Sequence, residues 1–140
     1  MKEYVNIAYS MGIERKPEGD SNLLNELMGK LEGICEKHEG FPFREGLAEL
    51  GHENVVPTAE NGFKEPPKTN EYARNRTRYL VGTVWVENSV DLFNGHRGTF
   101  VRYESGQDID ALLKDFDKVY KKGEKHESRI KVPDDEGKKF

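Results

Sequence analysis

The sequence predicts an α+β protein in which two helices cover one face of an antiparallel sheet. Two segments repeat apolar residues at helical spacing, and four others have the alternating or largely apolar pattern of strands. Their order, β-α-β-β-α-β, is the ferredoxin-like arrangement. A chain of 140 residues can bury a core as one domain, which we place at 1–132, followed by a charged, mobile tail at 133–140.

The first strand is predicted at 3–9, where apolar and polar residues alternate. A helix follows, with Asp20 or Ser21 as its N-cap and Gly40 shortly after its end. One face of this helix carries its apolar residues: Leu24, Leu27, Met28, Leu31, Ile34 and Cys35. Cys35 is the single cysteine of the chain, and its place in this stripe predicts a buried structural thiol.

Residues 39–76 form a connection too long for an ordinary loop in a compact domain. Its phenylalanines and aliphatic residues predict that it packs on a surface, with a short helix near 44–50. Gly29 and Gly33 lie on one side of the preceding helix. Without side chains, these glycines leave room for close approach of the 39–76 segment or of another subunit. They are equally consistent with no contact at all.

Two further strands are predicted at 78–87 and 98–104, paired antiparallel because Asn94-Gly95 favours a hairpin connection between them. With residue 87 opposite residue 98, Trp85 faces Phe100. Side chains alternate across a sheet, so Tyr79, Trp85, Phe100 and Arg102 are expected on one face, while the more apolar face lies under the helices.

The second helix is predicted at about 106–122. Its apolar stripe is Ile109, Leu112, Leu113, Phe116, Val119 and Tyr120. Ser105 and Asp108 resemble a capping box at its start, and Gly123 ends it. The last strand is predicted at 128–132, with Arg129 and Lys131 on the face of Trp85.

Composition excludes several classes of function. The net charge of −4 argues against a protein that coats long nucleic acid, because such proteins need a broad basic surface. No run approaches the ~18 apolar residues of a membrane span, and no signal-peptide core follows Met1, so we expect a cytoplasmic protein. The four histidines are scattered and Cys35 has no partner cysteine, so neither a metal nor a cofactor is expected.

Arginine is concentrated in one part of the chain. Five of the eight arginines lie between Lys68 and Lys114, a stretch without lysine: Arg74, Arg76, Arg78, Arg97 and Arg102. A guanidinium grips phosphate or carboxylate at two points and stacks on aromatic rings. The candidate ligand-binding residues are therefore Arg76, Arg78, Arg97, Arg102, Tyr79, Trp85 and Phe100.

The run Phe100-Val101-Arg102-Tyr103 resembles the end of the aromatic motif with which RNA-recognition-motif domains stack bases, and the predicted element order agrees with theirs. The upstream half of the motif differs, because Arg97-Gly98 lies one residue too close to Phe100. The long 39–76 insertion also has no place in a minimal domain of that family. The resemblance implies base stacking, and the family is not assigned.

The predicted hairpin places the Arg74 to Arg78 run and Arg97 at opposite ends, about 30 Å apart at ~3.3 Å per residue. A composite phosphate site would then need a second subunit, which favours a homo-oligomer. The turn between Gly95 and Gly98 could instead cradle an anion with Arg97 alone.

Three functions remain open. The leading hypothesis is non-catalytic binding of a phosphate-bearing ligand, either a nucleotide or a short single-stranded nucleic acid. The alternative is a protein-interaction module, such as an inhibitor or immunity-type protein, acting through residues 1–70, where 8 basic and 13 acidic side chains give a net charge of −5. An enzyme ranks third for want of a catalytic constellation. A structural alternative is that 39–72 covers the aromatic face and forms a second small core.

Overall fold

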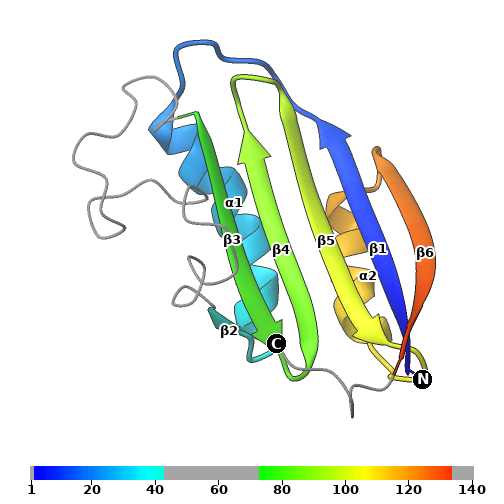
Figure 1. Ribbon diagram of the computed structural model, residues 1–140. Helices are drawn as coiled ribbons and strands as arrows, with labels where there is room; N and C mark the ends of the chain where they lie inside the picture. The colour runs from blue at the N-terminus through cyan, green and yellow to red at the C-terminus, as the bar shows by residue number, and fades with distance from the viewer. Residues whose placement is uncertain (1, 43–72, 134–140) are drawn as a thin grey trace.

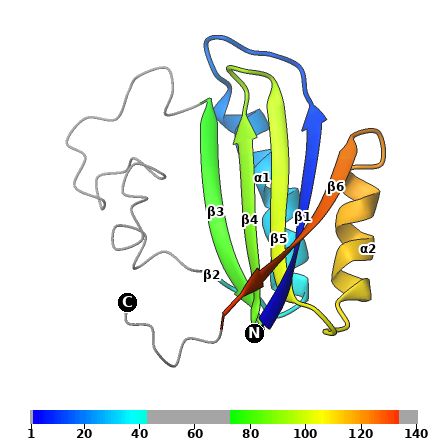
Figure 2. The ribbon, with the colours of Figure 1, turned by 45° about the vertical axis from the view of Figure 1, so that its right-hand side comes forward.

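A six-stranded antiparallel sheet carries two helices on one of its faces (Figures 1 and 2). The computed structural model describes residues 2–42 and 73–133. In chain order the elements are β1 (Lys2–Gly12), α1 (Ser21–Lys37), β2 (Phe41–Pro42), β3 (Arg74–Val81), β4 (Val84–Asp91), β5 (His96–Glu104), α2 (Asp110–Val119) and β6 (Glu124–Val132). Neighbouring strands follow the order β2-β3-β4-β5-β1-β6. The predicted α+β class is confirmed.

The ferredoxin-like topology is not confirmed, because the strand order differs. The segment predicted as one strand, 78–87, is interrupted by a two-residue turn at Gly82-Thr83, so that Val81 pairs with Val84. Gly82 has φ +63°, which suits the first central position of a type II′ turn and the twist of the flanking strands. The chain therefore builds two strands here, and β3 and the short β2 lie beside β4 at one edge of the sheet.

This turn changes which residues share a face. Trp85 pairs with Arg102 and Glu87 with Phe100, a shift of two residues from the predicted register, so the β4 and β5 residues keep their predicted faces. Tyr79 does not. It is buried on the helix side of the sheet, where its hydroxyl donates to Glu36 of α1 at 3.4 Å.

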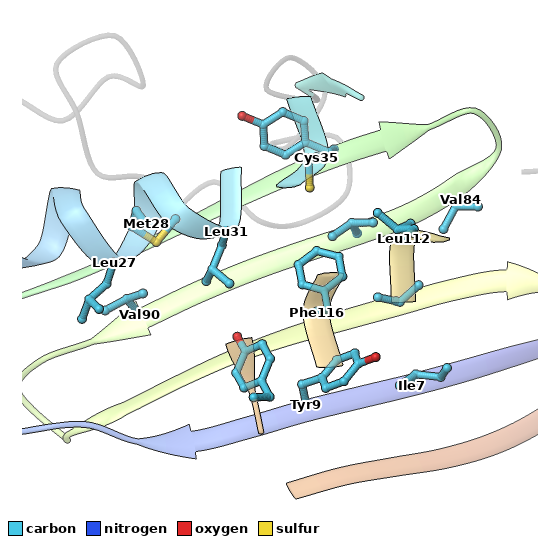
Figure 3. Close-up of a cluster of buried hydrophobic side chains, with 14 of the residues drawn as sticks. Ile7, Tyr9, Leu27, Met28, Leu31, Cys35, Val84, Val90, Leu112 and Phe116 are labelled. Carbon is cyan, nitrogen blue, oxygen red and sulfur yellow. The ribbon is translucent and has the colours of Figure 1, made fainter. Parts of the chain in front are cut away.

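The core lies between the sheet and the two helices (Figure 3). Phe116 of α2 is fully buried, 6.0 Å from Tyr9 of β1 between ring centroids, and Leu31 of α1 is buried in the same cluster. The other central side chains come from every layer: Val5, Ile7, Leu24, Leu27, Met28, Cys35, Val84, Val86, Val90, Val101 and Leu112. Full burial of each large apolar side chain contributes about 1.5–3 kcal/mol.

The helix termini follow the sequence only in part. Of the two predicted N-caps of α1, Asp20 and Ser21, the structure has Asp20. Its carboxylate accepts a hydrogen bond from the amide of Leu23 at 3.1 Å. The start predicted for α2 is wrong. Gly106 has φ +99°, a turn conformation, and α2 begins only after Ile109, with no side-chain cap.

The prediction for the last strand is also corrected. β6 starts at Glu124, four residues earlier than predicted, and all nine of its residues are exposed. Arg129 lies on the helix side, opposite Val5, and binds Glu127 at 3.0 Å and Glu3 at 3.5 Å. Without burial on either side, the apolar residues of an edge strand do not identify the face that the helices cover.

Three expectations fall wholly or mostly outside the described residues: the short helix near 44–50, the packing of 39–72 on the sheet, and the tail at 133–140. Within 2–42 and 73–133, neither helix is long and apolar enough to cross a membrane.

Gly29 and Gly33 provide a stability test. A Cβ atom at either position would have no neighbour within 4 Å among residues 2–42 and 73–133, and neither residue has positive φ. Because glycine costs a helix interior about 0.8–1.0 kcal/mol relative to alanine, Gly29→Ala and Gly33→Ala should each raise the free energy of unfolding by about that amount in urea denaturation.

The matched control is Gly40→Ala just beyond α1, where a Cβ would lie 2.7 Å from the carbonyl oxygen of Cys35 and should destabilise the protein. A loss of stability in the two helix variants would show instead that a neighbouring segment or subunit packs on these glycines.

Cys35 is buried as predicted, and Asn88 Nδ2 lies 3.7 Å from its sulfur. Burial raises the pKa of the Cys35 thiol to about 12. At pH 8 the thiolate is therefore scarce, and we expect negligible reaction with an aromatic disulfide reagent in the native state and one equivalent of reaction in denaturant. Rapid native labelling, at the rate of a free exposed thiol, would contradict this expectation.

Candidate functional site

The helix-free face is the sheet surface opposite α1 and α2, and Figure 1 views it with both helices behind the sheet. The pairing registers arrange its side chains in rows that run across β3, β4 and β5. The rows are Arg74, Asp91 and His96; Arg76, Ser89 and Gly98; Arg78, Glu87 and Phe100; and Leu80, Trp85 and Arg102. Adjacent strands lie about 4.8 Å apart, and successive rows are about 6.6–6.8 Å apart.

These rows correct the predicted separation of the arginines. The β3–β4 hairpin brings Arg74 opposite Asp91, which in turn lies opposite His96 next to Arg97. The two ends expected about 30 Å apart are thus two strands apart, at the same end of the sheet. A composite site on this chain does not require a second subunit.

Arg78 is the buried arginine of the helix-free face, only 4% exposed. Its Nη2 lies 2.7 Å from Glu87 Oε2, and its guanidinium carbon lies 5.7 Å from the centroid of the Trp85 ring. Its Nε and Nη1 have no hydrogen-bond partner in the described part of the chain. Burial lowers the pKa of Arg78 and the carboxylate of Glu87 opposes that shift, so the guanidinium stays charged.

Arg74 and Arg76 lie on the same strand and are about half exposed. Arg76 Nε approaches Glu87 at 3.6 Å, but that carboxylate lies closer to Arg78. Arg74 Nε is 3.8 Å from Asp91, which already accepts from the amide and side chain of Asn94 at 3.0 and 2.8 Å. Three guanidinium groups therefore share two carboxylates, one of which holds the β4–β5 turn.

Arg102 adds a fourth positive charge to the helix-free face. Its Nε donates to the neutral amide oxygen of Asn6 at 2.8 Å, and its guanidinium carbon lies 5.8 Å from the Phe100 ring centroid. No ion pair of Arg102 occurs within the described ranges. The four rows thus hold four arginines against two carboxylates, a local excess of positive charge beside aromatic rings.

Phe41 is a candidate that the sequence did not identify. It pairs with Leu80 from the two-residue β2, so it extends the row of Trp85, and it is 68% exposed. The sequence predicts only that Phe41 packs on a surface with the rest of the 39–76 segment, because no local pattern distinguishes it from the other phenylalanines there.

Two predicted site residues, Tyr79 and Arg97, lie on the helix side of the sheet. Arg97 is 6% exposed, with its guanidinium carbon 5.6 Å from the Tyr120 ring centroid in the core. It does not lie with the guanidinium groups of Arg76, Arg78 and Arg102. The expected anion cradle at Gly95 to Gly98 therefore lacks its arginine, because His96, rather than Arg97, occupies the helix-free face.

Each end of the sheet carries a hollow lined by described residues. One, of about 420 Å³, lies at the Arg74 end of the helix-free face and is lined by Arg74, Asn75, Arg76, Ser89, Val90, Asp91 and His96. The other, of about 670 Å³, lies at the opposite end of the sheet, between the β3–β4 turn and the start of α2. Its charged lining mixes His38 and Lys114 with Asp108 and Asp110, so it has no clear charge preference.

Nothing in 2–42 and 73–133 groups three or more His, Cys, Asp or Glu side chains as a metal site would require. Comparisons of the chain with protein families, with curated proteins and with solved structures find no match. The helix-free face offers cations and aromatic rings, which can together bind an anion attached to a planar ring.

Glu87→Gln tests the electrostatics of this face. The change keeps the shape of the side chain but leaves Arg78 buried without its ionic partner, which costs 3–5 kcal/mol for fully buried pairs. Because the Glu87 side chain is 23% exposed, we expect a loss of about 2–3 kcal/mol in urea denaturation.

Glu104→Gln is the matched control, since this exposed carboxylate on the same face has no ion pair to a described residue; it should change stability by less than about 0.5 kcal/mol. The double variant Arg78→Met/Glu87→Gln should recover part of the loss. If Glu87→Gln and Glu104→Gln proved equally stable, Glu87 would not be the group that compensates the charge of Arg78.

Proposed function

We propose that the protein binds a phosphate-bearing ligand, a nucleotide or a short single-stranded nucleic acid, on the helix-free face without transforming it. The observation that carries the proposal is the surplus of guanidinium groups over carboxylates beside aromatic rings on the helix-free face: four arginines against Glu87 and Asp91. Arg102 is the clearest case, because it lies over Phe100 and bonds only a neutral amide among the described residues.

In this proposal some residues of the helix-free face touch the ligand, and others hold those residues in place. Arg76 and Arg102 are exposed and supply charge to phosphate oxygens, and Phe100 supplies a ring on which a base stacks. Arg78 is too buried to meet a ligand first. Lying between Trp85 and Glu87, it is a positioning residue that fixes the ring and the carboxylate.

Binding without chemistry fits the polar groups of the face. Ser89 and His96 line the same hollow, and within the described residues no hydrogen bond joins them, so the hydroxyl is not paired with the imidazole as a nucleophile with its base. Asp91 is engaged by Asn94 and is not disposed as a general base.

The alternative role in protein recognition has weaker support. It would use the acidic residues of the N-terminal half. Among the described residues of that half, the largest group of exposed charges lies on the outer side of α1. There Glu26 and Glu36 alternate with Lys30 and Lys37, so the exposed charge is mixed rather than uniformly acidic. A basic partner gains little specificity from such a surface.

Titration with AMP and with a four-residue oligothymidylate tests the proposal. Trp85 is the single tryptophan and lies on the candidate face, so its fluorescence reports binding there, and the melting temperature should rise with ligand concentration. Arg102→Ala should weaken binding about tenfold or more, because hydrogen bonds to charged groups contribute about 1.5–3 kcal/mol.

Arg129→Ala is the matched control, because this arginine lies on the other face of the sheet and pairs with Glu3 and Glu127. It should leave affinity unchanged. If neither ligand alters fluorescence or melting temperature at millimolar concentration, the proposal fails.

A further inference from the structure

We infer that the hollow lined by Arg74, Arg76, Ser89, Asp91 and His96 is a subsite for the terminal phosphate of a nucleoside phosphate. This inference rests on the proposed function. It adds the direction in which the ligand lies across the helix-free face, with its terminal phosphate in the hollow. The hollow, about 420 Å³ in volume, spans the first two rows of the helix-free face.

Gly98 has no side chain beside this hollow, and the space is taken by the His96 ring. Gly98 pairs with Ser89 on one side and Ser10 on the other, so this row has only small side chains on the three central strands. A Cβ at Gly98 would lie 3.0 Å from the carbonyl oxygen of Tyr9, 3.3 Å from His96 Cε1 and 3.8 Å from Ser89 Oγ. The imidazole therefore lies over Gly98, in the space that a side chain would take, and it comes close to the Ser89 hydroxyl at the edge of the hollow.

The charge of the hollow is only partly compensated. Arg74 and Arg76 approach carboxylates through Nε, at 3.8 and 3.6 Å, and about half of each side chain is exposed. Asp91 has shorter bonds to Asn94, and Glu87 has a shorter contact with Arg78. Both guanidinium groups can thus turn their outer nitrogens toward an anion without leaving a carboxylate bare.

A phosphomonoester fits these donors better than an internal phosphodiester does. A terminal phosphate has three free oxygens and close to two negative charges at neutral pH, whereas a diester has two free oxygens and one charge. Two guanidinium groups, a hydroxyl and an imidazole line the hollow, together with the Asp91 carboxylate that Asn94 engages. These donors satisfy three oxygens rather than two.

The spacing to the aromatic rings gives the ligand its direction. Phe100 lies one row from Gly98, about 6.6–6.8 Å along the strand, and Trp85 lies one row further. With the terminal phosphate in the hollow, the base of the same nucleoside reaches the Phe100 row. A free mononucleotide and the phosphorylated end of a single strand share this chemistry.

The experiment compares ligands that differ only in the terminal phosphate. AMP should bind the wild-type protein at least tenfold more tightly than adenosine, by isothermal titration calorimetry. In Arg74→Ala/Arg76→Ala this preference should fall to near unity while adenosine affinity is kept, and Arg129→Ala should retain it. Inorganic phosphate should displace AMP but not adenosine.

A four-residue oligothymidylate with and without a 5′-phosphate identifies the source of the phosphate: a gain from phosphorylation supports a strand end, and a gain confined to AMP supports a free nucleotide. Circular dichroism and melting temperature establish that the double variant is folded. Arg74→Gln/Arg76→Gln, which keeps side-chain length, replaces it if it is not.

Equal affinity for AMP and adenosine, with no gain from the 5′-phosphate, would overturn the subsite and leave the proposed function standing. A preference for AMP that survives in the double variant would place the phosphate elsewhere and would also overturn it. Failure of every ligand to bind would overturn both proposals.

Discussion

The two-residue turn at Gly82-Thr83 is the constraint on which the rest of the structure depends. Because a turn of two residues reverses the chain within the sheet, it places Arg78 opposite Glu87 and Arg74 opposite Asp91. A longer connection, or a continuous strand, would carry the arginine run away from β5. The positive φ of Gly82 thus decides both the edge of the sheet and the composition of the helix-free face.

That face combines a rigid centre with adaptable sides. At its centre, Arg78 is held by Trp85 and Glu87 and is almost inaccessible, while Arg76 and Arg102 remain exposed. A buried guanidinium with two unsatisfied nitrogens among the described residues destabilises the fold, yet it fixes neighbouring side chains. The exposed arginines keep their long side chains free to adjust to a ligand, at an entropic cost that is met on binding.

The sequence predicted the elements whose patterns depend on a single buried face. The α1 stripe and its Asp20 cap follow directly from helical spacing, and Trp85, Glu87, Phe100 and Arg102 kept their face because a register error of two preserves alternation. The face of Tyr79 could not be predicted, because it depends on whether Gly82 forms a turn or continues the strand. A glycine inside an apolar run is compatible with both. Arg97 was not placed either, because the predicted strand began at residue 98 and left Arg97 in the turn, whereas β5 begins at His96 and its alternation puts Arg97 on the helix side. His96 and Ser89 entered the candidate site only once β3 was positioned.

The two edges of the described sheet differ in length and chemistry, and this difference bears on association between copies of the chain. β2 has two residues, one of them Pro42, which has no N–H to offer a further strand. β6 is a full nine residues long, but Lys125, Glu127, Arg129 and Lys131 stand along it at every second position. Charged side chains on an edge strand oppose extension of the sheet by another copy, so the strand can stay exposed without acting as a template for fibres.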